Sequence, residues 1–422
     1  MRVDNLTMDE LTYEMIQSWD ATCPFAAYRD YFDLPEGVIY LDGNSLGPLP
    51  KSVPTQIEKT MHQEWGQGLI RSWNAAGWID LPQKIATKIA TLIGADPDHV
   101  VVADSTSVNL FKTLSAALLL RPDRAKIITE ERNFPTDNYI AEGVINQMGK
   151  GHVISYATSP DAIADMIDED VAVVMLTHVN YRDGRCHDMQ ALTKAAHDKG
   201  ALVLWDLAHS AGAMPVDLMA CDADFAVGCG YKYLNGGPGA PAFLYVAPKH
   251  IGKTHQPLTG WFAHHSPFDF APHYEADTGI KQYLCGTPPV LSAIALDAAL
   301  DLWRDVDMQA LRQKSLALTG LFIRLVDGLC AGHDLTLITP REGAARGSQV
   351  SYTHPKHGYA IMAALIAENV IGDFRAPDIL RFGFTPLYTS YEDVWQAAHK
   401  LADILETRRW DQPHFHKRKA VT

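Results

Sequence analysis

The chain has 422 residues, a length typical of about two or three domains. It carries 36 Lys and Arg residues against 50 Asp and Glu residues, a formal charge of −14, which disfavours a general nucleic-acid binder because phosphate contacts need a positive face. Six cysteines without C-x-x-C spacing, no apolar signal segment and no apolar run near the ~20 residues of a membrane span indicate a soluble cytoplasmic enzyme that contacts no membrane.

Apolar, β-branched segments alternate with helical ones over most of the chain. Strands are predicted at residues 100–103, 125–129, 171–176, 201–205, 225–228 and 242–246. Between the third and fourth of these, Asp188 caps a helix that Gly200 ends, which makes a βαβ unit with parallel, buried strands. The predicted fold class is therefore α/β, with a mainly parallel central sheet flanked by helices.

The pattern changes after about Leu291, where a long helix is followed by helical segments and short strands at 335–338 and 349–352. This change predicts a smaller α+β domain. We expect an N-terminal segment over 1–55 that packs with the small domain, a large α/β domain over 56–290 and a small C-terminal domain over 291–422.

Motifs for several common cofactors are absent from the sequence. There is no G-x-x-x-x-G-K-[ST], no G-x-G-x-x-G after a strand and no H-E-x-x-H, and the adjacent His264 and His265 cannot share one helix face. A metal or NAD enzyme is therefore disfavoured, and no metal site is predicted.

Two strand ends carry residues suited to a Schiff-base site. Asp206 ends the strand at 201–205, and Lys232 follows the strand at 225–228, just before a glycine-rich turn. Ligands of such sheets gather beyond the carboxyl ends of the strands. A lysine there can bond to the aldehyde of pyridoxal phosphate while an aspartate pairs with its ring nitrogen. An ordinary salt bridge between Asp206 and Lys232 is the alternative.

Two further segments offer places for a phosphate and a ring. Thr106 and Ser107 precede a helix after the strand at 100–103, where free backbone amides favour an anion, although routine capping is the alternative. Phe134 is suited to stack on a ring and Asp137 to bond its polar edge; the alternative is a turn fixed by Pro135.

Arg381 lies within an apolar stretch, so its guanidinium should be paired. A substrate carboxylate suits its bidentate geometry. A structural ion pair within the small domain is the alternative.

Several segments together resemble the kynureninase family. They are YLDGNSLGP at 40–48, DSTSVNL at 104–110, FPTD at 134–137, DLAHSAG at 206–212, GYKYLNGGPG at 230–239, GWF at 260–262, and the segment from Leu380 to Tyr388. The Asn-Ser-Leu-Gly and Gly-Trp-Phe parts are more specific to kynureninases, whereas the Asp/His and Tyr-Lys parts recur in the wider fold-type-I group of pyridoxal phosphate (PLP) enzymes.

The resemblance implies a fold-type-I PLP-dependent transferase fold, related to aminotransferase class V. The implied reaction is hydrolysis of the Cβ–Cγ bond of L-kynurenine to anthranilate and L-alanine, in tryptophan degradation and NAD biosynthesis. Preference for 3-hydroxykynurenine is left open, since it depends on a few pocket contacts. The family also implies a homodimer with shared active sites.

The resemblance assigns roles to individual residues. Lys232 would bond to PLP and act as a base, Asp206 would hold the ring nitrogen and Tyr231 would relay protons. The cofactor-binding set is Thr106, Ser107, Phe134, Asp137, Thr177, Asp206, His209, Tyr231, Lys232, Trp261 and Thr287, of which Trp261 and Thr287 would come from the neighbouring subunit. The substrate-binding set is Arg381, Asn44, Ser45 and Trp73. Relatives often carry Asn in place of Thr287 and Ser in place of Thr177, and Thr287 has helix capping as its alternative.

Two other functions compete. A cysteine desulfurase or selenocysteine lyase of the same fold needs a mobile catalytic cysteine in the small domain, where Cys330 is the sole candidate and fits a core position better. A non-catalytic relative of these enzymes would not need Lys232, Asp206 and Arg381 together.

Overall fold

The computed structural model describes residues 10–419. They form two compact units. The large unit comprises residues Ser52–His178 and His187–Arg304. The small unit comprises residues 10–51, Val179–Cys186 and 305–419, so the first and last described residues belong to the same unit.

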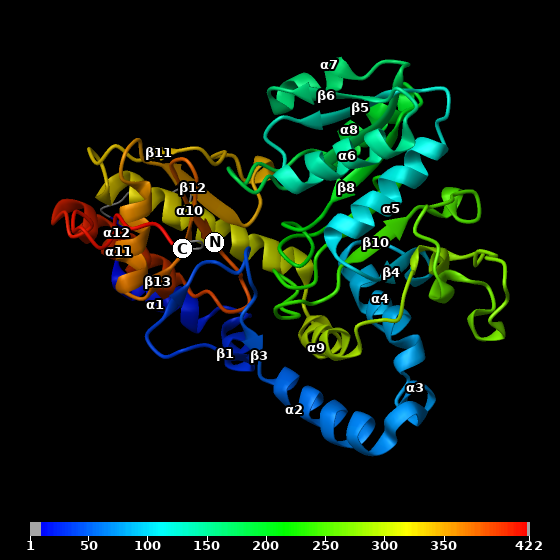
Figure 1. Cartoon of the computed structure of the whole chain (residues 1–422). Helices are drawn as coiled ribbons and strands as arrows, with labels where there is room; N and C mark the ends of the chain where they lie inside the picture. The colour runs from blue at the N-terminus through cyan, green and yellow to red at the C-terminus, as the bar shows by residue number, and fades with distance from the viewer. Residues whose placement is uncertain (1–9, 420–422) are drawn as a thin grey trace. The chain divides into compact units, whose positions relative to one another are not determined.

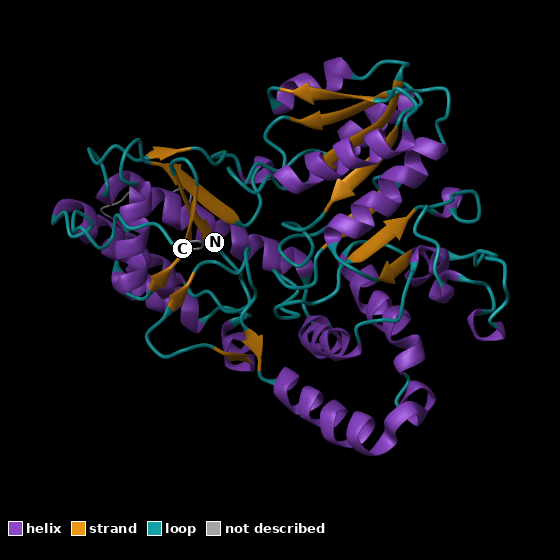
Figure 2. Ribbon diagram, in the orientation of Figure 1, coloured by secondary structure: helices purple, strands orange, loops and turns teal. Residues whose placement is uncertain are grey.

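A seven-stranded sheet forms the centre of the large unit (Figures 1 and 2). Its strands, in spatial order, are β4 (Val100–Val102), β10 (Phe243–Val246), β9 (Phe225–Gly228), β8 (Leu202–Asp206), β7 (Val171–Thr177), β5 (Lys126–Glu130) and β6 (Val153–Ala157). The five strands from β9 to β6 run parallel, and β10 runs antiparallel to both of its neighbours. Every residue of β7 and β8 is buried, as expected for strands covered on both faces.

Eight α-helices belong to the described part of the large unit. They are α2 (Ser52–Lys59), α3 (Ser72–Ala75), α4 (Leu81–Leu92), α5 (Thr106–Leu119), α6 (Pro135–Met148), α7 (Ile163–Met166), α8 (Met189–Asp198) and α9 (Val290–Leu300). The predicted cap of α8 is confirmed, because the Ala191 amide donates to Asp188 Oδ1 at 2.9 Å. Helix α5 packs on β7, β9 and β10, and α8 packs on β8.

The small unit is built around an antiparallel sheet. Its strand order is β11 (Thr336–Leu337), β12 (Gln349–Thr353), β15 (Ile379–Gly383) and β14 (Asp373–Arg375). Two short pairs accompany it: β2 (Ile39–Tyr40) beside β13 (Val370–Ile371), and β1 (Phe32–Asp33) beside β3 (Leu49–Pro50). The helices are α1 (Tyr13–Ala21), α10 (Met308–Leu329), α11 (Gly358–Ala367) and α12 (Tyr391–Glu406).

Some elements differ from the sequence-based prediction. The helix near Leu291 was assigned to the small domain, yet α9 packs on α2 and α4 and lies in the large unit. The short segment Val179–Cys186 groups with the small unit, partly because Cys186 donates its amide to the Ala345 carbonyl. Strand β6, at the edge of the sheet, was not predicted, because only one of its five residues is buried and it lacks the continuous apolar run of the interior strands.

No helix within residues 10–419 is long and apolar enough to cross a membrane. Within the same residues, no group of three or more His, Cys, Asp or Glu side chains is arranged to hold a metal ion.

Candidate active site

The ends of β7 and β8 bring Thr177 and Asp206 side by side, since the two residues are partners in the strand register. Both side chains are buried. The Asp206 carboxylate accepts a hydrogen bond from the Ala208 amide at 2.8 Å, which turns the chain sharply after the strand. Asp206 is therefore held at the carboxyl edge of the sheet, where the sequence placed it.

A second buried carboxylate belongs to Asp137, in the first turn of α6. Its Oδ2 accepts from Thr177 Oγ1 at 3.3 Å. Pro135 opens the helix instead of fixing an isolated turn, because its ring needs no amide partner at a first helical position. The alternative of an isolated turn fixed by Pro135 is therefore wrong.

The two carboxyls, Asp137 and Asp206, depend on each other's charge. Burial raises the pKa of Asp137 well above its usual range, and the negative charge of Asp206 raises it further. Burial also raises the pKa of Asp206, while the Lys232 ammonium opposes the rise at both residues. One ammonium group cannot neutralise two buried carboxylates. The site therefore favours either one proton shared between Asp137 and Asp206 or a second cation beside them.

Lys232 follows β9 on the turn that leads into the glycine-rich segment. Its Nζ lies 5.8 Å from the Phe134 ring centroid and 5.8 Å from the Tyr231 ring centroid. The turn closes through a 2.8 Å hydrogen bond from the Gly236 amide to the Gly230 carbonyl. A Cβ at Gly236 would lie only 2.7 Å from that carbonyl oxygen, so a larger residue would displace the lysine segment.

The N-terminus of α5 is the candidate anion site. Ser105 caps the helix by accepting from the Val108 amide, so Thr106 and Ser107 are the first two helical residues. Their amides lack carbonyl partners within the helix, which suits a phosphate. The nearby Asp104 carboxylate is neutralised by the fully buried Lys112 at 2.5 Å.

The remaining predicted residues of the large unit are also located. His209 is buried, with its ring 6.4 Å from the Tyr233 ring, and Trp73 packs on Trp78 and Phe262. Trp261 is 39% exposed. Thr287 is exposed and does not cap α9, whose N-cap is Pro289.

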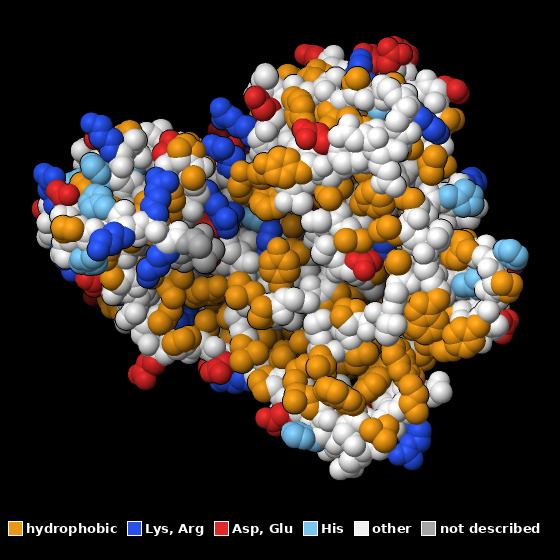
Figure 3. Space-filling model, viewed as in Figure 1, with side chains coloured by type: hydrophobic (Ala, Val, Ile, Leu, Met, Phe, Trp, Pro, Cys, Tyr) orange, Lys and Arg blue, Asp and Glu red, His pale blue; other side chains and the backbone are white. Residues whose placement is uncertain are grey.

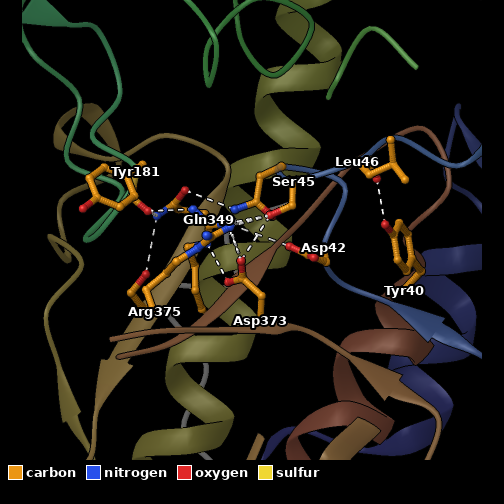
Figure 4. A network of polar contacts seen from close by, with 11 residues as sticks. Tyr40, Asp42, Ser45, Leu46, Tyr181, Gln349, Asp373 and Arg375 are labelled. Atoms are coloured by element: carbon orange, nitrogen blue, oxygen red, sulfur yellow. Dashed lines mark hydrogen bonds and ion pairs between the residues drawn. The ribbon is translucent and has the colours of Figure 1, made fainter. Parts of the chain in front are cut away.

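Arg381 lies in the small unit and is 2% exposed. Its Nε and Nη2 donate to the two oxygens of Asp373 at 2.8 and 2.6 Å (Figure 4). Nη1 donates to the Tyr181 carbonyl at 2.9 Å and Nη2 also donates to Ser45 Oγ at 2.6 Å. The structural ion pair considered as an alternative is thus present. Asn44 is fully buried, and its Nδ2 lies 3.4 Å from Gln349 Oε1.

Sequence analysis missed several members of this arginine network: Asp42, Tyr181, Gln349, Asp373 and Arg375. The apolar surroundings of Arg381 predicted an anionic partner for its guanidinium. Which residue provides that anion depends on the register of β14 against β15, which places Asp373 opposite Arg381. No local pattern in the sequence reveals that pairing.

Comparisons with known proteins identify the family. A family model described as the kynureninase C-terminal domain matches residues 311–401, and one for the DegT/DnrJ/EryC1/StrS aminotransferases matches residues 67–227. A kynureninase from Pseudomonas fluorescens is 54% identical over 96% of this chain and 98% of its own. The chain belongs to the kynureninase family. A kynureninase from Burkholderia mallei (strain SAVP1) is 51% identical over 97% of this chain and 100% of its own.

Solved structures with lower sequence identity share the fold of this kynureninase-family chain. A cysteine desulfurase from Thermococcus onnurineus NA1 superposes with a TM-score of 0.78 at 21% identity, covering 90% of this chain and 98% of its own. A C-DES variant with glycine covalently linked to its PLP cofactor gives 0.77 at 18% identity, covering 89% and 99%. The predicted fold class is therefore confirmed.

Proposed function

We propose that the chain is a kynureninase, which uses water to cleave the Cβ–Cγ bond of L-kynurenine and yields anthranilate and L-alanine in tryptophan degradation. The observation that carries the proposal is the buried pair of Asp137 and Asp206 facing Lys232, in a chain 54% identical to a kynureninase. A relative that merely kept the fold would gain nothing from two buried acids whose charges burial disfavours.

The donor set fits PLP. Two buried carboxyls beside one ammonium can accept a hydrogen bond from a protonated pyridine nitrogen, the first amides of α5 suit the phosphate of PLP, and Lys232 provides the amine. We assign the cofactor to the predicted binding residues of this chain: Thr106, Ser107, Phe134, Asp137, Thr177, Asp206, His209, Tyr231 and Lys232. When bound, PLP withdraws electrons from the substrate α-carbon and so acidifies its proton.

The protein residues then orient the reactants and move protons. The Asp206 carboxylate keeps the ring nitrogen protonated, and Asp137 supports that charge from α6. Phe134 restricts the tilt of the ring. Lys232 Nζ would take up the α-proton of the substrate, and Tyr231 Oη would carry protons for the later steps.

The substrate carboxylate is assigned to Arg381, with Asn44, Ser45 and Trp73 as further substrate contacts. The guanidinium already holds the Asp373 carboxylate by its Nε edge, so its orientation is set before substrate binds. Because the guanidinium is held in this way, it loses little side-chain entropy when it binds a carboxylate.

We further propose a homodimer in which Trp261 and Thr287 complete the phosphate site of the neighbouring subunit. Hydrophobic side chains gather over α9 and the helical arm of α2, η4 (Thr60–Gly68) and α3 (Figure 3). Met61, Trp65, Leu69, Ile70 and Leu291 are all exposed there, and Ile70 is 77% exposed. An apolar surface of this kind is typical of a subunit interface.

The cysteine desulfurase alternative finds no support in Cys330. This thiol is 4% exposed at the end of α10, and burial raises its pKa to about 12. A nucleophilic cysteine needs the opposite environment, exposed and with a lowered pKa.

A cytoplasmic location is also proposed, because all six cysteines are free thiols, as a reducing compartment favours. Enzyme activity found in the cytosolic fraction of the source cells, and not outside the cytoplasmic membrane, would support it.

The purified protein should form anthranilate from L-kynurenine and show the visible absorption band of a lysine-bound cofactor. Lys232→Ala should lose the band and at least about 10³-fold in turnover, because no other amine replaces the imine-forming base. Tyr231→Phe should keep the band and turn over more slowly by about 10²-fold. Lys199→Ala, an exposed lysine on the same unit, is the control. Sulfide released from cysteine without anthranilate formation would instead favour a desulfurase.

A further inference from the structure

The arginine network of the small unit contains Arg381, Arg375, the buried carboxylate of Asp373 and the partly buried carboxylate of Asp42. Arg381 and Arg375 both contact Asp373, each with Nη2 2.6 Å from its Oδ2, and Ser45 Oγ accepts from both guanidinium groups (Figure 4). With both carboxylates ionised, the two positive and two negative charges cancel.

Asp42 is the less firmly held of the two acids. Its backbone bridges to Gly383 at the end of β15, and its Oδ1 lies 3.9 Å from Arg381 Nη2, beyond hydrogen-bond distance. That oxygen is buried and has no hydrogen-bond partner among the described residues. Asp373, in contrast, accepts the full Nε–Nη2 edge of Arg381. Protonation of the network therefore requires the least free energy at Asp42.

A substrate carboxylate would change this charge balance. Of the five N–H groups of Arg381, four already donate to Asp373, Ser45 and the Tyr181 carbonyl. A third carboxylate at Arg381 leaves three negative charges against two positive ones in a buried site. Charge imbalance in such surroundings is relieved by protonation.

We propose that Asp42 takes up a proton when the substrate α-carboxylate binds Arg381, so that this residue sets how substrate affinity falls as pH rises. The inference rests on the proposed function, which assigns the carboxylate to Arg381. Asp42 acts through Arg381 and is thus a positioning residue and not a catalytic one.

The surroundings of Asp42 place this exchange near neutral pH. Burial, followed by the charge of Asp373, raises the pKa of Asp42 to about 7, although Arg381, Ser45 and Arg375 oppose the rise. The Tyr40 phenol also faces the group and stays neutral, because burial raises its pKa above its usual value. Asp42 therefore exchanges its proton near neutral pH, and a bound substrate carboxylate shifts it toward the protonated form.

The test measures KM and kcat of the PLP-loaded enzyme for L-kynurenine between pH 6 and 9. The rise in KM above pH 7 should approach about tenfold per pH unit in the wild type, because one proton is linked to binding. Asp42→Asn should remove that rise and leave kcat within about twofold. Asp33→Asn, an exposed acid in β1, should behave as the wild type. An unchanged KM profile in Asp42→Asn overturns the inference.

Other outcomes separate the inference from the function on which it rests. Absence of anthranilate with the wild type contradicts the proposed function. An unchanged KM in Arg381→Lys contradicts the Arg381 assignment, and the inference falls with it. If Asp42→Asn does not fold, calorimetry of propionate binding to the wild-type holoenzyme decides. In two buffers of different ionisation enthalpy at pH 7.5 it should show uptake of more than about half a proton per site, and no uptake overturns the inference.

Discussion

At the scale of single residues, the unusual feature of the large unit is the buried pair Asp137 and Asp206. The charge of Asp206 raises the free energy of the ionised form of Asp137, and burial raises the free energy of the ionised form at both residues. Without PLP the pair relieves this by sharing a proton. With PLP, the protonated ring nitrogen would supply the missing positive charge. Cofactor binding would thus lower the electrostatic free energy of the two buried carboxyl groups.

Asp206→Asn should therefore separate stability from function. The apoprotein should unfold at the same temperature as the wild type or a higher one, because the repulsion is gone, while kcat of the holoenzyme falls by about 10²-fold or more. Asp137→Asn is the matched variant, which also relieves the repulsion but keeps the Asp206 carboxylate, so its loss of kcat should be smaller. Thermal unfolding of the apoproteins and steady-state kinetics measure both effects. A lower unfolding temperature for Asp206→Asn would contradict the account.

At the scale of elements, the interior parallel strands β7, β8 and β9 were predictable because both faces are covered and each strand is a continuous apolar run, whereas the edge strand β6 was not. Strands β7 and β9 begin where the sequence placed them, and β8 begins one residue later. Residues that follow such strands, including Asp206 and Lys232, could therefore be assigned to one edge of the sheet. The Arg381 network could not be assembled from the sequence, because it joins Asp42, Tyr181 and Asp373 through strand pairing and loop packing across distant segments.

The amino ends of β8 and β9 are joined to surrounding elements by Asp224, whose side chain is fully buried. His197 Nε2 of α8 lies 2.7 Å from it, His250 Nε2 lies 2.8 Å away and the Val203 amide donates to it at 2.9 Å. Burial alone would raise the pKa of Asp224, but hydrogen bonds with His197 and His250 outweigh burial and hold the pKa below its usual range. This carboxylate therefore stabilises the packing of α8 against the sheet.

Asp224→Asn should lower the free energy of unfolding at pH 7 by about 3 kcal/mol, because it removes the charge of a buried, paired group. The folded-state pKa lies below the ~3.9 of an unfolded aspartate, so the stabilisation is present above that pH and is lost as pH falls through the folded-state value. The difference between wild type and variant should narrow below pH 4 in urea titrations. Asp222→Asn, whose side chain is 68% exposed, should cost less than about 1 kcal/mol. A difference that stays constant down to pH 2.5 would refute this role.

At the scale of the whole molecule, the proposed dimer makes each active site depend on two chains. Burial of the apolar surface that includes Trp65 and Ile70 would favour association of two chains. In the proposed dimer, association also brings Trp261 to the active site of the neighbouring subunit. In a two-fold dimer both subunits contribute the same residues to the one interface, so two equivalent sites form together.

Mixed dimers test this sharing directly. Lys232→Ala and Trp261→Ala should each be strongly impaired alone, yet a dimer with one subunit of each kind contains one site with both native residues. Random pairing of equal amounts makes half of the dimers mixed, so co-refolding should restore about a quarter of wild-type activity. Each variant refolded with itself is the control and should recover nothing. Differently tagged subunits confirm that mixed dimers form. If they form without recovered activity, Trp261 serves its own subunit or none, and the shared site is wrong.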